Sequence, residues 1–403
     1  MIPVPEKRVA EFEEKAFGMF IHFGLYSQLG KGEWIKHFEK IPDDEYNKLF
    51  ESFDPSGFDA RAIARIAKRA GMKYITLTSR HHEGFSLYDT CGLSDFDAPH
   101  APNCRRDLIR EFVDGCNEEG ITPMFYHTTL DWHMRSFNDD FPSYLQYLRD
   151  SVEILCTNYG KIGGLWFDGN WSKPDADWEE DKLYAVIRRH QPDAIIVNNT
   201  GLDARGRTGN IEIDSVTYEQ GRPEPMDREG MSKYVAAEMC CTINDHWGVG
   251  KLDLNYKSLP YLIETLCACR KLGANLLLNV GPDGDGSILP LQQYLLSGMG
   301  DWINYYGGCI YKAKPCGVKG EGKNFALKDG KKIYLFIHDL GIGGSAKEAR
   351  FTGLSGKVKS VRFTDGGEEL EFTQDDDALK VGATPFPYGK NGVVRVAEVD
   401  IIK

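Results

Sequence analysis

The sequence lacks the features that mark secreted, membrane-spanning and nucleic-acid-binding proteins. Its first residues, Met1 to Arg8, contain no apolar core of a signal peptide, and no apolar stretch is long enough to span a bilayer. Acidic side chains outnumber basic ones by 60 to 48, and the net charge of −12 opposes binding to nucleic acids and to anionic membranes. We therefore expect a cytoplasmic protein with no nucleic-acid and no membrane partner.

The spacing of the cysteines predicts neither a disulfide framework nor a zinc site. The ten cysteines form no short-loop framework and no paired CxxC clusters of the kind that bind zinc. Cys267 and Cys269 alone are a weak signal. Others lie inside apolar runs, where a reduced cysteine packs as a small hydrophobic residue: Cys156, Cys240 and Cys241.

Strand-like and helix-like segments alternate from Gly18 to Tyr306, as parallel α/β structure requires. About eight strands are predicted, which is near the number that a closed barrel needs. A doubly wound open sheet is the competing architecture, but it would place its ligand at one switch point. Polar and aromatic clusters here end many strands, which favours the barrel. The predicted strands are Gly18–Phe23, Lys73–Thr78, Ile121–Tyr126, Ile162–Phe167, Ala194–Asn198, Ser215–Tyr218, Ala236–Thr242 and Ala274–Val280.

The sequence pattern changes after Gly307 and Gly308, from alternating strands and helices to short strands separated by turns. Segments such as Lys332–His338 and Lys357–Phe363 are predicted as strands, with turns such as Asp365-Gly366-Gly367 between them. A chain of 403 residues is also long for one domain. The sequence thus predicts a (β/α)₈-like barrel over residues 1–308, followed by a small antiparallel β-sandwich over residues 309–403.

Asp168 is the most informative residue of the chain. It ends a short apolar run and lies between Trp166 and Trp171. A carboxylate at the end of a core strand is costly unless it is paired or takes part in chemistry. The two indole rings offer flat apolar faces of the kind that stack on sugar rings. In a (β/α)₈ barrel this position belongs to the catalytic face.

Other strand ends carry the same mixture of polar tips and aromatic rings. His22 ends the first strand, Glu33 and Trp34 follow it, and Tyr126 ends the third. The stretch Ser79–Phe85, which contains His81 and His82, has the most unusual composition of these strand ends. Hydrogen bonding to a polyhydroxylated ligand suits it best, because neutral histidine both donates and accepts.

Two other interpretations of Ser79–Phe85 stay open. A solvated loop is one. A metal site is the other, since imidazole and carboxylate are ordinary ligands, but the spacing is not that of HExxH and no third ligand is evident. The acidic turn Gly281–Gly286 lacks the lysine of a phosphate loop and is interpreted as a tight loop, with calcium as an alternative. We predict no metal and no cofactor.

Glu219 is the second carboxylate candidate, at the end of a short strand and before a loop rich in glycine and proline. A solvated loop glutamate would look the same. Glu238 and Asp245 follow it in the chain, beside Trp247. Glycoside hydrolysis needs two carboxyl groups that flank one bond, one protonated and one ionised. The sequence supplies two carboxylates on separate strand ends, but not the distance between them.

Together these motifs resemble the retaining α-L-fucosidases of glycoside hydrolase family 29, from Phe17 to Tyr311. The matching segments are IHFGLYS, GEW, SRHHEGF, LDWH, LWFDGNW, VTYEQG, CTINDHWG and NLLLNVGPDGDG. The resemblance implies an exo-glycosidase that releases terminal α-L-fucose from a fucosylated oligosaccharide or glycoconjugate by double displacement. It also implies a barrel followed by a β-sandwich.

The resemblance assigns roles to the site residues. Asp168 would be the nucleophile and Glu219 the general acid/base, with Glu238 in reserve because this position varies in the family. Many members carry an arginine where this chain has Asn198-Asn199-Thr200, and Arg205 or Arg207 is the candidate substitute. The residues that would shape the fucose pocket are His22, Glu33, Trp34, His81, His82, Tyr126 and Trp166. The alternatives are a non-catalytic carbohydrate-binding protein on the same scaffold and a metal-dependent barrel hydrolase.

Overall fold

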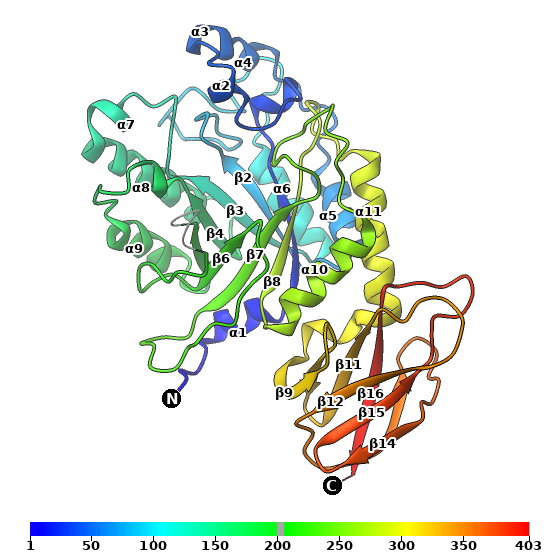
Figure 1. The fold of residues 1–403 in the computed structure, drawn as a ribbon. Coiled ribbons are helices and arrows are strands. Elements are labelled where there is room, and N and C mark those ends of the chain that lie inside the picture. The colour runs from blue at the N-terminus through cyan, green and yellow to red at the C-terminus, as the bar shows by residue number, and fades with distance from the viewer. Residues whose placement is uncertain (200–204, 403) are drawn as a thin grey trace.

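A closed barrel of eight parallel strands forms the first part of the molecule (Figure 1). The computed structural model describes residues 1–199 and 205–402. The barrel closes where Phe17 pairs with Leu276 and Ile21 pairs with Val280. The predicted barrel is therefore confirmed, and the doubly wound sheet is excluded. Its strands are β1 (Phe17–Ile21), β2 (Tyr74–Arg80), β3 (Thr122–Thr128), β4 (Gly164–Asp168), β5 (Ile195–Asn199), β6 (Ser215–Glu219), β7 (Ala236–Thr242) and β8 (Asn275–Val280).

Six longer helices surround the barrel (Figure 1). Two begin as the sequence suggests, because Asp59 accepts a hydrogen bond from Ala62 N and Asp107 accepts one from Arg110 N. The second ends at Gly120, whose φ of 71° is the left-handed conformation that glycine adopts without cost. These helices are α5 (Ala60–Arg69), α6 (Leu108–Glu119), α8 (Phe141–Thr157), α9 (Glu180–His190), α10 (Leu259–Lys271) and α11 (Pro290–Trp302).

Shorter elements fill the connections and one end of the barrel. Helix α1 (Lys7–Glu13) covers the end where the strands begin, with the Phe12 ring 5.4 Å from that of Tyr74. The Asn275 amide donates a 2.7 Å hydrogen bond to the Phe12 carbonyl. Helix α1 therefore packs against this end of the barrel, and the polar strand ends predicted from the sequence lie at the other end. The remaining short elements are η1 (Leu25–Gln28), α2 (Ile35–Phe38), α3 (Asp43–Tyr46), α4 (Lys48–Ser52), α7 (Ser136–Asp139), η2 (Asn170–Ser172), η3 (Ile303–Gly307) and η4 (Gly308–Tyr311).

An antiparallel sheet of eight strands forms the C-terminal part, as predicted. Figure 1 shows it beside α10 and α11, away from α2 to α4. The Trp302 indole donates a 3.0 Å hydrogen bond to the Val394 carbonyl across this contact. The predicted boundary between residues 308 and 309 falls within η4, directly after its first residue Gly308, and the division into two domains stays a prediction. In spatial order the strands are β13 (Lys357–Phe363), β16 (Val394–Ile402), β11 (Lys332–His338), β10 (Phe325–Asp329), β9 (Lys314–Gly320), β12 (Lys347–Thr352), β15 (Ala378–Ala383) and β14 (Phe372–Asp375).

None of the helices in the described residues is both long enough and apolar enough to cross a membrane. All ten cysteines are free thiols, and most of them are buried, as small apolar side chains would be.

Candidate active site

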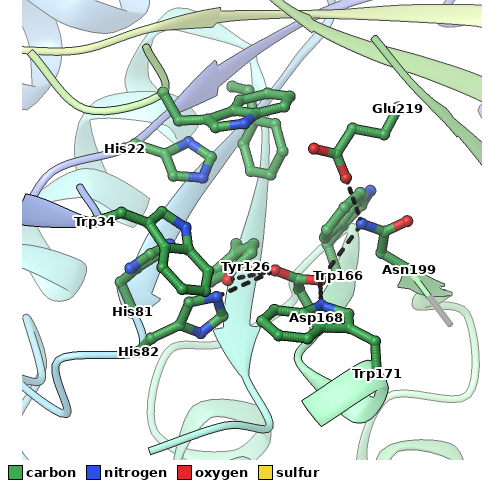
Figure 2. Close-up of a pocket in the computed structure, with 12 residues that line it drawn as sticks. His22, Trp34, His81, His82, Tyr126, Trp166, Asp168, Trp171, Asn199 and Glu219 are labelled. Carbon is green, nitrogen blue, oxygen red and sulfur yellow. Dashed lines mark hydrogen bonds and ion pairs between the residues drawn. The ribbon is translucent and has the colours of Figure 1, made fainter. Parts of the chain in front are cut away.

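A pocket opens at the end of the barrel where the strands finish (Figure 2), and its empty volume, including the solvent-filled mouth, is about 430 Å³. It contains every site residue predicted from the sequence except Glu33 and the reserve candidate Glu238. Parallel strands finish at the same rim, and direct register pairs place Thr128 beside Asp168 and Asp168 beside Asn199. The lining residues are Phe20, His22, Trp34, His81, His82, Tyr126, Trp166, Asp168, Trp171, Asn199, Glu219 and Trp247.

Asp168 is surrounded by hydrogen-bond donors. The Tyr126 hydroxyl donates to Oδ2 at 3.1 Å, and the Trp171 indole donates to Oδ1 at 3.0 Å. His82 Nε2 lies 3.5 Å from Oδ2. Burial by itself would raise the pKa of Asp168, but the interactions with His82, Trp171 and Tyr126 outweigh it and lower the pKa below its ordinary value. Asp168 is therefore ionised at neutral pH, as a nucleophile must be.

Glu219 has the opposite electrostatic environment. Its pKa is raised to about 7, first by burial and second by the negative charge of Asp168. The Asn199 amide and the nearby Arg205 oppose this shift without cancelling it. A carboxyl group with such a pKa is partly protonated at neutral pH and can both donate and accept a proton. Glu219 is thus not the solvated loop residue that the sequence left open.

One amide group connects the two carboxylates (Figure 2). Asn199 Nδ2 lies 2.7 Å from Glu219 Oε2 and 3.4 Å from Asp168 Oδ1. These two oxygens cannot be farther apart than the two distances added together. In inverting glycosidases the two carboxyl groups are at least roughly 6.5 Å apart, which is more than this limit. In retaining enzymes they are roughly 5–5.5 Å apart, which is within it.

Two histidines, His22 and His81, supply neutral polar groups on the opposite wall. His22 Nδ1 lies 2.7 Å from Asn279 Oδ1, which can only accept, so His22 donates there and keeps Nε2 as an acceptor. Burial lowers the pKa of His22 to about 3 and lowers that of His81 well below its ordinary value. His81 Nδ1 is buried and has no hydrogen-bond partner among the residues that the structure describes. Such atoms suit the hydroxyl groups of a sugar, which both donate and accept.

Aromatic rings form the rest of the wall. The Trp166 ring lies 5.7 Å from that of Tyr126 with the planes at 22°, and 5.2 Å from that of Phe20. The Trp247 ring lies 5.1 Å from that of His22. Polar atoms at precise positions between flat apolar faces are typical of a site that binds one small, polyhydroxylated ligand.

Two predicted carboxylates lie outside this lining. Glu33 Oε2 accepts a 2.8 Å hydrogen bond from the backbone of Gly248, so the side chain supports the wall from behind. Glu238 is buried inside the barrel, where it accepts hydrogen bonds from Tyr74 and, at 3.0 Å, from the Trp166 indole. Burial raises the pKa of Glu238 to about 7, but it holds Trp166 from below and does not face the cavity.

The stretch Ser79–Phe85 is buried, which excludes the solvated-loop interpretation. Strand β2 continues through Arg80, and the His82 carbonyl accepts a 2.8 Å hydrogen bond from Trp132 N. Among residues 1–199 and 205–402, no group of three or more His, Cys, Asp or Glu side chains is arranged to hold a metal ion.

The pocket residues predicted from the sequence did not include Phe20, Trp171, Asn199 and Trp247. The indole of Trp171 beside Asp168 was a signal for a sugar-binding face, whereas the other three had only their adjacency to predicted residues. Of the expected arginine substitutes, Arg205 lies near Glu219, whereas Arg207 lines a separate surface hollow. Thr200 lies outside the described residues.

A barrel whose rim brings together an ionised carboxylate, a carboxyl group with raised pKa and a wall of aromatic rings is a glycoside hydrolase. Comparisons with known proteins define the family. The family model described as Alpha-L-fucosidase matches residues 4–308, and the chain belongs to this family.

Solved structures and curated proteins agree with this family. The structure of alpha-L-fucosidase isoenzyme 1 from Paenibacillus thiaminolyticus is 33% identical, with a TM-score of 0.87, over 98% of this chain and 99% of that one. A Thermotoga maritima alpha-fucosidase, solved in complex with a mechanism-based inhibitor, is 25% identical, with a TM-score of 0.77, over 99% and 97%. Tissue alpha-L-fucosidase of Rattus norvegicus is 28% identical over 81% of this chain and 76% of its own length. The two alternative functions are not favoured.

Proposed function

We propose that this enzyme releases terminal α-L-fucose from fucosylated glycans by double displacement, with Asp168 as the nucleophile and Glu219 as the general acid/base. The observation that carries this assignment is the Asn199 amide, which contacts both carboxylates. The two groups are close enough to act on the two sides of one glycosidic bond.

In the first step, an oxygen of Asp168 attacks the anomeric carbon of the fucose. Glu219 gives its proton to the glycosidic oxygen, the bond from that oxygen to the anomeric carbon breaks, and the rest of the glycan leaves. The product is a fucosyl ester of Asp168 and an ionised Glu219. The pKa of about 7 supports this role, because a large fraction of Glu219 carries the proton at neutral pH.

In the second step, Glu219 removes a proton from water, and the water oxygen attacks the anomeric carbon. The ester bond breaks, and Asp168 returns to its ionised state. The negative charge of Asp168 is one cause of the raised pKa of Glu219. Esterification removes that charge, so the pKa of Glu219 falls when a base is needed. Two inversions at the anomeric carbon give fucose with its configuration retained.

Azide rescue tests both roles through the configuration of the product. In Asp168→Gly, azide takes the place of the nucleophile, attacks the substrate once, and should give β-L-fucosyl azide from an aryl fucoside. In Glu219→Ala, azide attacks the fucosyl-enzyme and should give α-L-fucosyl azide. The products are distinguished by NMR.

Glu238→Ala is the matched control, because it removes a carboxyl group of similar pKa that does not face the pocket. The assignment is wrong if Asp168→Gly retains substantial turnover. Rescue to the α-azide by Glu238→Ala and not by Glu219→Ala would move the acid/base role to Glu238. The cytoplasmic location expected from the sequence stays a prediction, which cell fractionation would test.

A further inference from the structure

A group of aromatic rings extends from the pocket to the surface. We call it the rim cluster, and its members are Trp34, His37, Phe38, Trp132 and Trp171. The Trp34 ring lies 5.8 Å from that of Trp171, 5.1 Å from that of Trp132 and 5.9 Å from that of Phe38. The His37 ring is stacked on Trp132 at 5.7 Å. Trp34 and Trp171 line the pocket and the other three do not, so the cluster begins at the site and ends outside it.

Phe38 is the exposed end of the cluster. It is 75% exposed, although phenylalanine is among the residues most often buried. The exposure does not come from a loose segment. Helix α2 is anchored by the buried Ile35 and Lys36, and the Trp34 carbonyl accepts hydrogen bonds from the backbones of His37 and Phe38 at 2.9 and 3.0 Å. The exposed Phe38 ring is continuous with the half-buried Trp34 and Trp132 rings, and an apolar group of this kind beside a pocket is typical of a contact surface.

We propose that the rim cluster binds the sugar to which the fucose is attached, with Phe38 and Trp132 contacting the apolar C–H face of its pyranose ring. This proposal rests on the proposed function and adds the residues that contact the leaving sugar. The fucose occupies the pocket between Trp34 and Glu219, so its neighbour in the glycan must extend through the opening. Trp34 belongs to both the pocket wall and the rim cluster, which makes this surface continuous with the path of the leaving sugar.

The variant Phe38→Ala separates this role from catalysis. It is compared with the wild type on α-L-fucosyl fluoride, whose leaving group is one atom, and on a panel of fucosyl disaccharides. For the best disaccharide we expect kcat/KM to fall about threefold to tenfold, mainly through KM, since one aromatic contact is lost. For the fluoride we expect a change of less than about twofold. Phe38→Tyr, which keeps the ring, should restore the disaccharide kinetics.

Tyr294→Ala is the matched control, because Tyr294 is an exposed aromatic residue of α11 outside the cluster and is 69% exposed. Equal losses on both substrates, or no loss on either, would overturn the proposal. So would unchanged disaccharide kinetics combined with a lower mass in sedimentation, which would assign Phe38 to a contact between copies of the chain. If the wild type turned over neither substrate, the proposed function itself would fail, and that result is distinct from a failure of Phe38.

Discussion

The C-terminal sheet and the barrel pocket both bury charged side chains, and they compensate those charges in opposite ways. In the sheet, Arg395 is 3% exposed and lies 3.1 Å from both Asp365 and Glu368. In the pocket, Asp168 and Glu219 share one amide, and none of the described lining residues is a lysine or an arginine. The sheet pairs opposite charges, whereas the pocket places like charges together.

This difference separates stability from chemistry. A buried ion pair that loses one partner leaves an uncompensated charge, so the residues around Arg395 hold each other in place. Two neighbouring carboxyl groups instead push their pKa values apart, which gives one ionised and one protonated group in the same cavity. Substitutions in the pocket should therefore change the reaction, and substitutions in the sheet should change the free energy of unfolding.

The largest effect is expected for Asp168→Asn. Turnover of an aryl fucoside should fall about 10⁴-fold or more, because no covalent intermediate can form. The free energy of unfolding should change by less than about 2 kcal/mol, since lost hydrogen bonds to the carboxylate are opposed by relief of the repulsion from Glu219. Steady-state kinetics and chemical denaturation give the two values. A variant that is inactive only because it unfolds would break the comparison.

A smaller effect, and on stability alone, is expected for Arg395→Met. Asp365 would stay buried without its partner, and the free energy of unfolding should fall by about 3 kcal/mol. The value of kcat/KM should stay at the wild-type level under conditions where the variant is folded. Arg362→Met on the neighbouring strand is the control, because Arg362 is 44% exposed and its ion pairs should contribute less than about 1 kcal/mol. Equal losses in the two variants would contradict the distinction.

The smallest effect is a shift in the pH profile. Glu219 must be protonated to act as the acid, so kcat/KM of the wild type should fall as the pH rises above about 7. The Asn199 amide lowers the pKa of Glu219 by donating to Oε2. Asn199→Ala removes that donor, so the decline should move to higher pH. The pH dependence of kcat/KM measures the shift.

Glu238→Gln provides the control for this shift. Glu238 also has a pKa of about 7, but it does not line the pocket. In Glu238→Gln, kcat/KM should still fall as the pH rises above about 7. Loss of this fall would show that Glu238, and not Glu219, is the acid. The raised pKa of Glu219 also affects stability. The folded state binds more protons than the unfolded state between its ordinary pKa and about 7, so this group makes the protein less stable as the pH rises through that range.

The barrel and Asp168 were predictable because both leave strong local signals. Eight strand-like runs, most of them separated by helical patterns, leave few alternatives to a closed parallel barrel. A carboxylate at the end of one of these runs is a strong signal, because burying an unpaired charge costs free energy. The same reasoning found His22, His81 and His82 at other strand ends.

The choice between Glu219 and Glu238 was not predictable from their surroundings in the sequence. The register of β6 against β7 pairs Glu219 with Cys240 and Thr217 with Glu238. Glu238 therefore lies two residues deeper in the barrel than Glu219, below Trp166, although both belong to neighbouring strands. The burial of Ser79–Phe85 likewise depends on a distant segment, since Trp132 binds the His82 backbone.

The sequence by itself determined which strands form and which of them end in polar side chains, because apolar periodicity and the cost of burying charge act on neighbouring residues. Only the tertiary structure decided which two carboxyl groups share one cavity and which third side chain connects them. That outcome depends on the stagger of strands that pair across the closed barrel, and this stagger sets the height of each side chain relative to residues far away in the chain.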